Sequence, residues 1–225
     1  MIKQSLTALG LAAATLTMTP AAFAAAPAAV MSNYADMAQA KFSDSLEAAK
    51  ALDTALDALI ANPSDATLQA AKDAWFASRV PYMQTEVYRF GNPIVDDWEG
   101  RVNAWPLDEG LLDYVDASYG GPTDENEFAV LNLVANASFD LSGEMVDASM
   151  LTPALLQDTL HEADGVEANV ATGYHAIEFM LWGQDLNGHG EGAGNRAWTD
   201  YAMGDDCTNG NCDRRGEFLA ALADL

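Results

Sequence analysis

The sequence predicts an all-α protein, an up-down helical bundle. Two long amphipathic segments lie in its first half, and their apolar residues recur at the spacing of one helix face. No segment shows the strict alternation of apolar and polar residues that is typical of a half-buried strand. The chain of 225 residues is long enough for one large domain with a substantial core.

The first residues are typical of an export signal. Lys3 is the only charged residue in this region, and an apolar run extends from Leu6 to Met18. The small-x-small pattern at Ala22–Ala24 follows a proline and matches a signal-peptidase site. We therefore expect a cleaved signal peptide at residues 1–24 and a periplasmic or secreted protein.

The remaining residues, 25–225, are expected to form one helical domain. No segment after the signal is long and apolar enough to span a bilayer, so we expect no transmembrane segment after cleavage. The net charge is −24, from 34 acidic and 10 basic residues. Such a charge repels nucleic acid and anionic membranes, and we expect no nucleic-acid partner.

The first two helices are predicted by periodicity and by their end signals. Residues 31–61 carry leucines at helical spacing, and Asn62–Pro63 ends this helix. Ser64 is placed to cap the second helix, which Gly91–Pro93 ends. Pro81 is expected to kink it.

The second half of the chain is less regular. Residues 92–122 are rich in Trp, Pro, Asp and Gly, and we expect them to be irregular. Helical spacing and cap signals predict four further helices, at residues 123–137, 152–163, 166–182 and 213–225. A glycine-rich loop separates the last two. The final helix shows no stop signal, which suggests that the natural protein is longer.

The cysteines predict a disulfide, and the arginines predict buried ion pairs. Cys207 and Cys212 flank an Asn-Gly turn, and in an oxidising compartment such a pair is expected to form a disulfide. A zinc site is the weaker alternative, because no partner histidine is near. Every basic residue after Lys72 is an arginine. Because arginine holds carboxylates more rigidly than lysine does, we expect some of these arginines to bind buried acids.

One helix carries the best candidate for a functional site. His175 and Glu178 are three residues apart, which places them on one helix face, one turn apart. Such a pair can offer an imidazole nitrogen and a carboxylate oxygen to one metal ion. Gly173 would allow another backbone or a ligand to approach closely. A structural hydrogen bond or ion pair is the more frequent role of a lone pair at this spacing, so both interpretations stay open.

Three stretches together resemble the imelysin family, also called peptidase family M75. They are residues 81–90, 100–109 and 173–185, in the same order as in the family, and the Cys212–Arg215 segment also fits. Family members resemble two packed helical bundles in a longer chain. The resemblance implies an exported bacterial protein linked to iron acquisition, with iron-uptake components of the envelope as partners.

The resemblance also implies site residues. His175 and Glu178 belong to the signature that is proposed to bind metal, and Glu86 is the third ligand candidate, with an ion pair to Arg79 or Arg89 as its alternative. Four more residues fall in matching stretches as supporting candidates: Arg101, Asn103, Asp108 and Glu109. For the two acids, capping of a following helix is an equally good explanation.

Three functions remain. The first is metal binding for iron acquisition, with a divalent or ferric ion, iron or zinc. The second is a metallopeptidase, which needs three protein ligands, an open position for water and a general base, whereas the sequence shows only two clear ligands. The third is an interaction module in which the pair His175 and Glu178 is purely structural.

Overall fold

The computed structural model describes residues 26–225 of the chain. The predicted signal peptide, residues 1–24, lies outside the described residues. The described part is a helical bundle with one small hairpin, which confirms the predicted fold class. Within residues 26–225, no helix combines the length and the apolar character that crossing a membrane requires.

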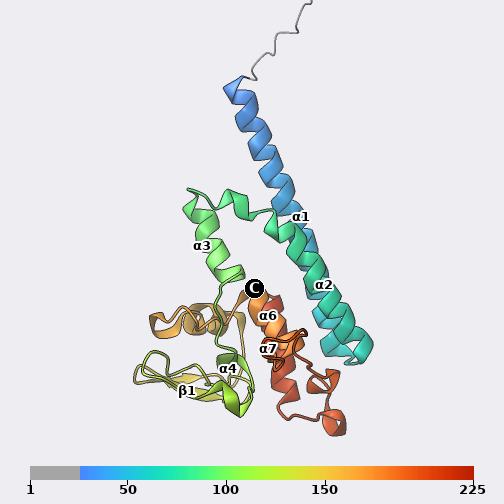
Figure 1. Ribbon diagram of the computed structural model, residues 1–225, viewed down its shortest axis with the longest axis vertical. Helices are drawn as coiled ribbons and strands as arrows, with labels where there is room; N and C mark the ends of the chain where they lie inside the picture. Colours follow the sequence, from blue (N-terminus) through green and yellow to red (C-terminus); the bar gives the residue numbers. More distant parts are fainter. Residues whose placement is uncertain (1–25) are drawn as a thin grey trace, which may run out of the picture.

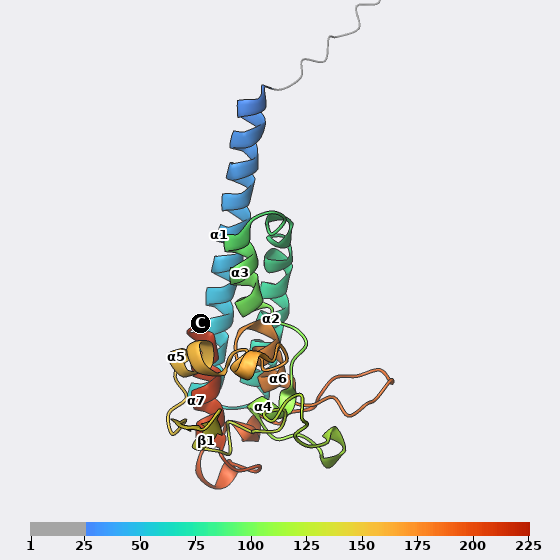
Figure 2. The ribbon, with the colours of Figure 1, turned by 90° about the vertical axis from the view of Figure 1, so that its left-hand side faces the viewer.

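Helices α1 (Pro27–Ala61) and α2 (Asp65–Met83) form the antiparallel pair that organises the bundle (Figure 1). The predicted cap is confirmed, because the Ser64 hydroxyl accepts from Thr67 N at 3.2 Å while the Thr67 hydroxyl accepts from Ser64 N at 3.0 Å. Pro81 lies inside α2, which ends at Met83 and not at Gly91–Pro93 as predicted. The N-terminal half of α1 extends well beyond the rest of the molecule (Figure 2).

Helices α6 (Gly173–Trp182) and α7 (Cys212–Ala223) pack against this pair and against each other. Their contact with the C-terminal half of α1 forms the main core. Large side chains from all three helices are fully buried there: Leu56, Leu59, Met180, Leu181 and Phe218. The predicted last helix is confirmed, and it ends at Ala223.

Residues 92–122, expected to be irregular, contain helix α3 (Pro93–Val102) and the single turn α4 (Glu109–Leu112). The signal for α3 is present in the sequence. Pro93 stands in the first turn, where its fixed φ suits a helix and its missing N–H costs nothing. Asp96 near the start and Arg101 near the end complement the helix dipole.

The helix predicted at residues 123–137 is wrong. This segment runs alongside α4 instead, where Asn132, Leu133 and Val134 donate their backbone N–H groups to the carbonyls of residues 110–112. Phe128, Leu133 and Val134 are buried in that position. The apolar residues at helical spacing are therefore explained by packing against α4, which overrides local propensity.

A hairpin follows, which the sequence interpretation missed. Strands β1 (Ser138–Leu141) and β2 (Glu144–Asp147) pair antiparallel, with Phe139 opposite Val146. The two turn residues, Ser142 and Gly143, both have positive φ, as the tight primed turns of hairpins require. The Ser142-Gly143 pair is the sequence feature from which this turn could have been predicted.

The helix predicted at residues 152–163 is shorter than expected. Thr152 caps it as predicted, with its hydroxyl accepting from Leu155 N at 3.2 Å. One turn of α5 (Pro153–Leu155) continues as a π-helical turn to Leu160. Single turns of 3-10 helix make up the remaining short elements: η1 (Glu86–Tyr88), η2 (Ala117–Tyr119), η4 (Ala163–Gly165), η5 (Trp198–Asp200) and η6 (Gly204–Asp206).

Candidate metal-binding pocket

The candidate residues share one face of α6. His175, Glu178 and Trp182 are half-buried, whereas Tyr174, Ala176, Ile177 and Phe179–Leu181 are buried. His175 Nδ1 and Glu178 Oε2 are 2.9 Å apart, with 18% and 42% of the two side chains exposed. The pair thus lies on the helix face that is open to solvent. Because both side chains keep contact with water, neither needs a hydrogen-bond partner to compensate for burial.

The first turn of α6 is fixed by a close backbone contact. Gly173 has φ of +81°, and a Cβ at this position would stand 2.6 Å from the Arg101 carbonyl oxygen at the end of α3. The neighbouring Thr172 hydroxyl donates to the same oxygen at 2.7 Å. The prediction that Gly173 permits close approach of another backbone is confirmed. It also explains why the helix begins at Gly173 and not at residue 166.

This contact defines how Arg101 supports the site. The Arg101 side chain is exposed, and it is the backbone carbonyl that holds α6. Asn103 follows two residues later, at the C-cap of α3. Its side-chain oxygen accepts from Arg79 Nη1 at 2.6 Å and its amide nitrogen donates to Glu99 at 3.1 Å, which ties α3 to α2. Both residues therefore position the helix and do not face its open side.

The open face of α6 borders a pocket of about 280 Å³. His175, Glu178 and Trp182 line it from α6, Glu109 from α4 and Asp185 from the loop after α6. The Trp105 ring packs on the His175 ring, with centroids 5.1 Å apart, and forms an outer wall. One imidazole and three carboxylates thus come together from three separate segments.

Helix α2 holds the inner wall of this pocket. Trp182 packs edge-on against Trp75 and Phe76, each with ring centroids 5.4 Å away. The Trp75 indole N–H donates to the Tyr174 carbonyl at 2.9 Å. These contacts fix both the rotation of α6 and the position of its last residue.

The pocket concentrates negative charge. Burial, together with the nearby carboxylates of Asp185 and Glu178, raises the pKa of Glu109 to about 6, while Arg196 acts in the opposite direction. A cation that enters the pocket would stabilise the charged form of these carboxyl groups. Proton uptake by Glu109 and cation binding would relieve the same repulsion.

Asp108 precedes Glu109 but faces elsewhere. Its carboxylate accepts from the Tyr119 hydroxyl at 3.1 Å and from the Asn126 amide at 2.5 Å. Asn126 continues the network to Asn169 at 2.8 Å. Asp108 has no side-chain cap bond to α4, so its role is to join the loops that lead into and out of the pocket region.

A comparison with known protein families decides the relationship of the chain. The family profile described as imelysin, Peptidase_M75, matches residues 38–225. The chain belongs to the imelysin family. A search of curated proteins found no match. The three stretches on which the resemblance rested all fall inside the matched region.

The imelysin signature residues provide suitable donor chemistry for a metal without forming a finished site. Imidazole and carboxylate ligands suit zinc and iron ions. Among residues 26–225, however, no three His, Cys, Asp or Glu side chains are grouped closely enough to hold a metal ion as they stand. Ligation would therefore require Glu109 or Asp185 to turn toward the pair His175 and Glu178.

Glu86 lies apart from this imelysin pocket. It stands on η1 beyond the end of α2, and the pocket is lined by other residues. No ion pair of Glu86 with Arg79 or Arg89 is present in the described part of the chain. Arg89 pairs with Asp96 at 2.8 Å and Glu99 at 2.9 Å instead.

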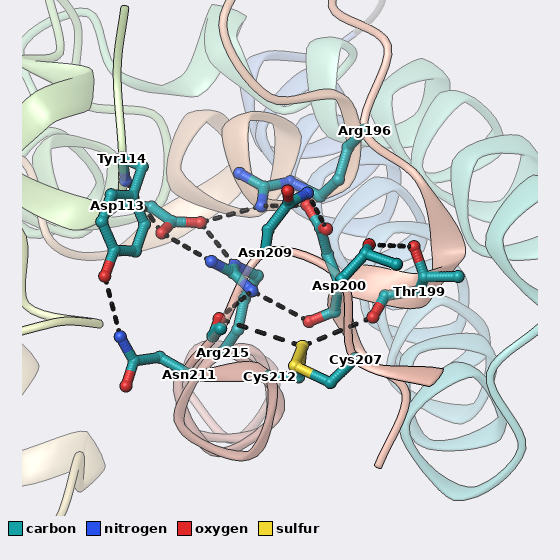
Figure 3. Close-up of a disulfide and its surroundings, with 12 residues drawn as sticks. Asp113, Tyr114, Arg196, Thr199, Asp200, Cys207, Asn209, Asn211, Cys212 and Arg215 are labelled. Carbon is teal, nitrogen blue, oxygen red and sulfur yellow. Dashed lines mark hydrogen bonds and ion pairs between the residues drawn. A yellow bond between two sulfur atoms is a disulfide. The ribbon is translucent and has the colours of Figure 1, made fainter. Parts of the chain in front are cut away.

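The sequence interpretation missed two acids of the imelysin fold. Asp185, in the pocket, is the last residue of the stretch 173–185 that resembles the family, and this position was the signal that could have identified it. Asp113 is 1% exposed and is held by two arginines. Arg196 Nη1 lies 2.8 Å and Arg215 Nε 2.7 Å from Asp113 Oδ2, and Arg196 also pairs with Asp200 at 3.2 Å (Figure 3). The prediction that arginines hold buried acids is confirmed.

The predicted disulfide between Cys207 and Cys212 is also confirmed and borders this ionic cluster (Figure 3). The loop that it closes contributes the Gly210 carbonyl, which accepts from Arg215 Nη1 at 3.1 Å. Asn209 in the same loop donates to Asp200. Burial would raise the pKa of Asp113, but the charges of Arg196 and Arg215 and the hydrogen bond from Arg215 outweigh it and lower the pKa.

Proposed function

We propose that this family member is an exported protein that binds iron or zinc and serves iron acquisition in the bacterial envelope. The observation that carries the proposal is the common pocket of His175, Glu178, Glu109 and Asp185. The raised pKa of Glu109 supports it, because burial and the neighbouring carboxylates both disfavour the charged form of this group, and a bound cation would offset both effects.

In this proposal His175 and Glu178 bind the metal first, and Glu109 and Asp185 complete its coordination. The ion would supply positive charge that neutralises the pocket. Other residues position and shield the site. Gly173 and Arg101 hold α6 in place, and Trp105 and Trp182 limit the access of water. Transfer of the ion to iron-uptake components of the envelope would follow the release of these ligands.

A titration of the metal-stripped protein tests the proposal. Fe(II), Fe(III) as a weak chelate and Zn(II) are added separately, and binding is followed by calorimetry and by the melting temperature. At about 100 times Kd, ligand binding adds about 2.7 kcal/mol to the stability. This corresponds to a rise of about 5–10 °C in Tm for a chain of this size.

The chain offers a matched control. The double variant His175→Ala, Glu178→Ala should bind metal about 100-fold more weakly or worse, because two ligands are lost. The variant His189→Ala, Glu191→Ala removes the same two residue types from the exposed loop after α6 and should bind as the parent does. Equal binding by all three proteins, or no binding by the parent, would refute the pocket as the metal site.

Further variants and assays separate the remaining interpretations. Glu86→Gln should retain full affinity if the pocket alone binds the metal, and a loss would restore Glu86 as a ligand. Cleavage of an unfolded protein substrate that depends on metal and on His175 and Glu178 would indicate a metallopeptidase. Expression that does not rise under iron limitation would contradict the role in iron acquisition.

A further inference from the structure

A second pocket shares Trp182 and Gly183 with the first. Its volume is about 570 Å³, and neither His175 nor Glu178 lines it. Amide side chains dominate its rim, together with one phenol and the Trp182 indole. The rim includes Tyr114, Trp182, Gln184, Asn195 and Asn209. This composition differs from that of the first pocket, whose lining contains no amide side chain.

The floor of the second pocket carries balanced charge. Arg196 and Arg215 are neutralised by Asp113 and Asp200, to which they are bound by the ion pairs and hydrogen bonds described above. No positive charge is left over to attract an anion, and Asp116 on the rim would repel one. The floor aspartates are occupied by arginines, so they are not free to bind a cation.

One buried donor in this floor lacks a partner. Arg196 is 9% exposed, and its Nε–H makes no hydrogen bond to any described residue. A Cβ on Gly183, which also lines the pocket, would stand 3.7 Å from this nitrogen, so the absent side chain leaves space beside it. The nitrogen is covered in this conformation, so a ligand oxygen would bond to it after a small shift of the Arg196 side chain toward the pocket. Because an unpaired buried donor is costly, such a bond would be favourable.

The rim amides also keep unused hydrogen-bonding groups. Gln184 accepts from Asp116 N at 2.6 Å through its oxygen, which leaves its amide nitrogen free to donate. Asn209 donates to Asp200 through its nitrogen, which leaves its oxygen free to accept. Asn195 is exposed, and none of the hydrogen bonds of the described residues involves its side chain. The pocket therefore presents donors and acceptors side by side.

We propose that this second pocket binds a neutral polyhydroxylated molecule, a sugar or polyol. Each hydroxyl group both donates and accepts, which matches the mixed amide rim and the unpaired Arg196 donor. Trp182 and the half-exposed Tyr114 offer flat apolar surfaces for the C–H faces of a sugar ring. None of the four proposed metal ligands lines this second pocket, so sugar binding does not require a metal ion.

Ligand-observed NMR and calorimetry on the metal-stripped protein test this proposal. The neutral probes are galactose, maltose and glycerol, and the charged probes are citrate and spermidine. At least one neutral probe should bind saturably with a Kd of about 1 mM or lower. The double variant Gln184→Ala, Asn195→Ala should weaken this binding about tenfold, since two hydrogen-bonding side chains are removed.

Control variants make the outcome specific. The exposed residues Asn33 and Gln69 lie on α1 and α2, away from the pocket, and Asn33→Ala, Gln69→Ala should bind the probe as the parent does. The variant His175→Ala, Glu178→Ala should also retain sugar binding while it loses metal, so the two proposals can fail separately. No saturable binding of a neutral probe up to about 100 mM, undiminished binding by the rim variant, or a preference for citrate or spermidine would overturn the proposal.

Discussion

At the scale of single residues, the pocket on α6 brings together groups whose chemistry depends on neighbours far away in sequence. His175 and Glu178 could be identified because a helix places them on one face whatever the rest of the chain does. Glu109 is 66 residues from His175 and was a candidate because of the family resemblance and as an acid close to the rigid Trp105–Pro106 pair. No local pattern predicts that it shares a pocket with Asp185, because tertiary packing sets that distance.

The raised pKa of Glu109 gives a prediction about pH. Its pKa in the folded protein, about 6, lies above the value of about 4.3 in an unfolded chain. The folded state therefore binds more protons between these values, and its stability falls as the pH rises through this window. Glu109→Gln mimics the protonated form. After allowance for solvent screening of this half-buried group, it should stabilise the metal-free protein by about 1 kcal/mol at pH 7 and by nothing at pH 4.

Urea unfolding of parent and variant at both pH values measures this difference. Glu144→Gln, at an exposed position on β2, serves as the control and should change stability by less than about 0.5 kcal/mol at either pH. A stabilisation by Glu109→Gln that is equal at the two pH values would show that charge repulsion in the pocket is not its cause.

At the scale of elements, the helices with a regular apolar pattern could be predicted from the sequence. Segments whose conformation depends on contacts with other elements could not. α1 follows from its leucine spacing, and α2 follows from the Ser64 cap and its apolar residues, signals that act within one segment. Residues 123–137 carry an equally good apolar pattern, yet their backbone groups bond to α4. The N-terminal limit of α6 was also mispredicted, because the reason that Gly173 must be glycine lies in the backbone of α3.

The start of α6 gives the prediction at this scale. Gly173→Ala forces a Cβ to within 2.6 Å of the backbone of Arg101 and Val102 and imposes a positive φ on alanine. These two effects should destabilise the protein by at least about 2 kcal/mol. The displaced helix start should also weaken metal binding, because His175 is two residues away. Urea unfolding and metal titration measure the two effects.

Gly216→Ala on α7 is the matched control for this substitution. A Cβ there would meet only the Ile60 Cγ2 atom, at an ordinary 3.7 Å, and the position lies inside a helix. Alanine should therefore leave the stability unchanged or raise it by up to about 1 kcal/mol. If the two substitutions had the same effect, the close contact between α3 and α6 would not be what requires glycine at position 173.

At the scale of the whole molecule, charge is divided between two environments. The chain has a net charge of −24, and most of its acids lie at the surface, where their mutual repulsion opposes the compact state. The cluster of Asp113, Arg196, Asp200 and Arg215 is buried and internally neutral. Dissolved salt screens the surface acids strongly and the buried cluster weakly.

This division predicts that salt stabilises the protein. Raising the ionic strength from about 0.01 M to about 0.15 M shortens the Debye length from about 30 Å to about 8 Å, which removes most of the surface repulsion. A gain of about 1–2 kcal/mol would raise Tm by about 3–6 °C for a chain of this size. The measurement is a thermal melt of the metal-stripped protein with a chelator present, so that no divalent ion contributes.

The identity of the salt separates screening from specific binding. Sodium chloride and choline chloride at equal ionic strength should raise Tm equally, because screening depends on charge and concentration and not on how a cation fits a site. A larger effect of sodium would indicate that the carboxylates bind it directly. A Tm that stays constant or falls with salt would mean that surface repulsion does not limit stability. The buried ion pairs, or attractive pairs at the surface, would then dominate the electrostatic balance of this strongly acidic chain.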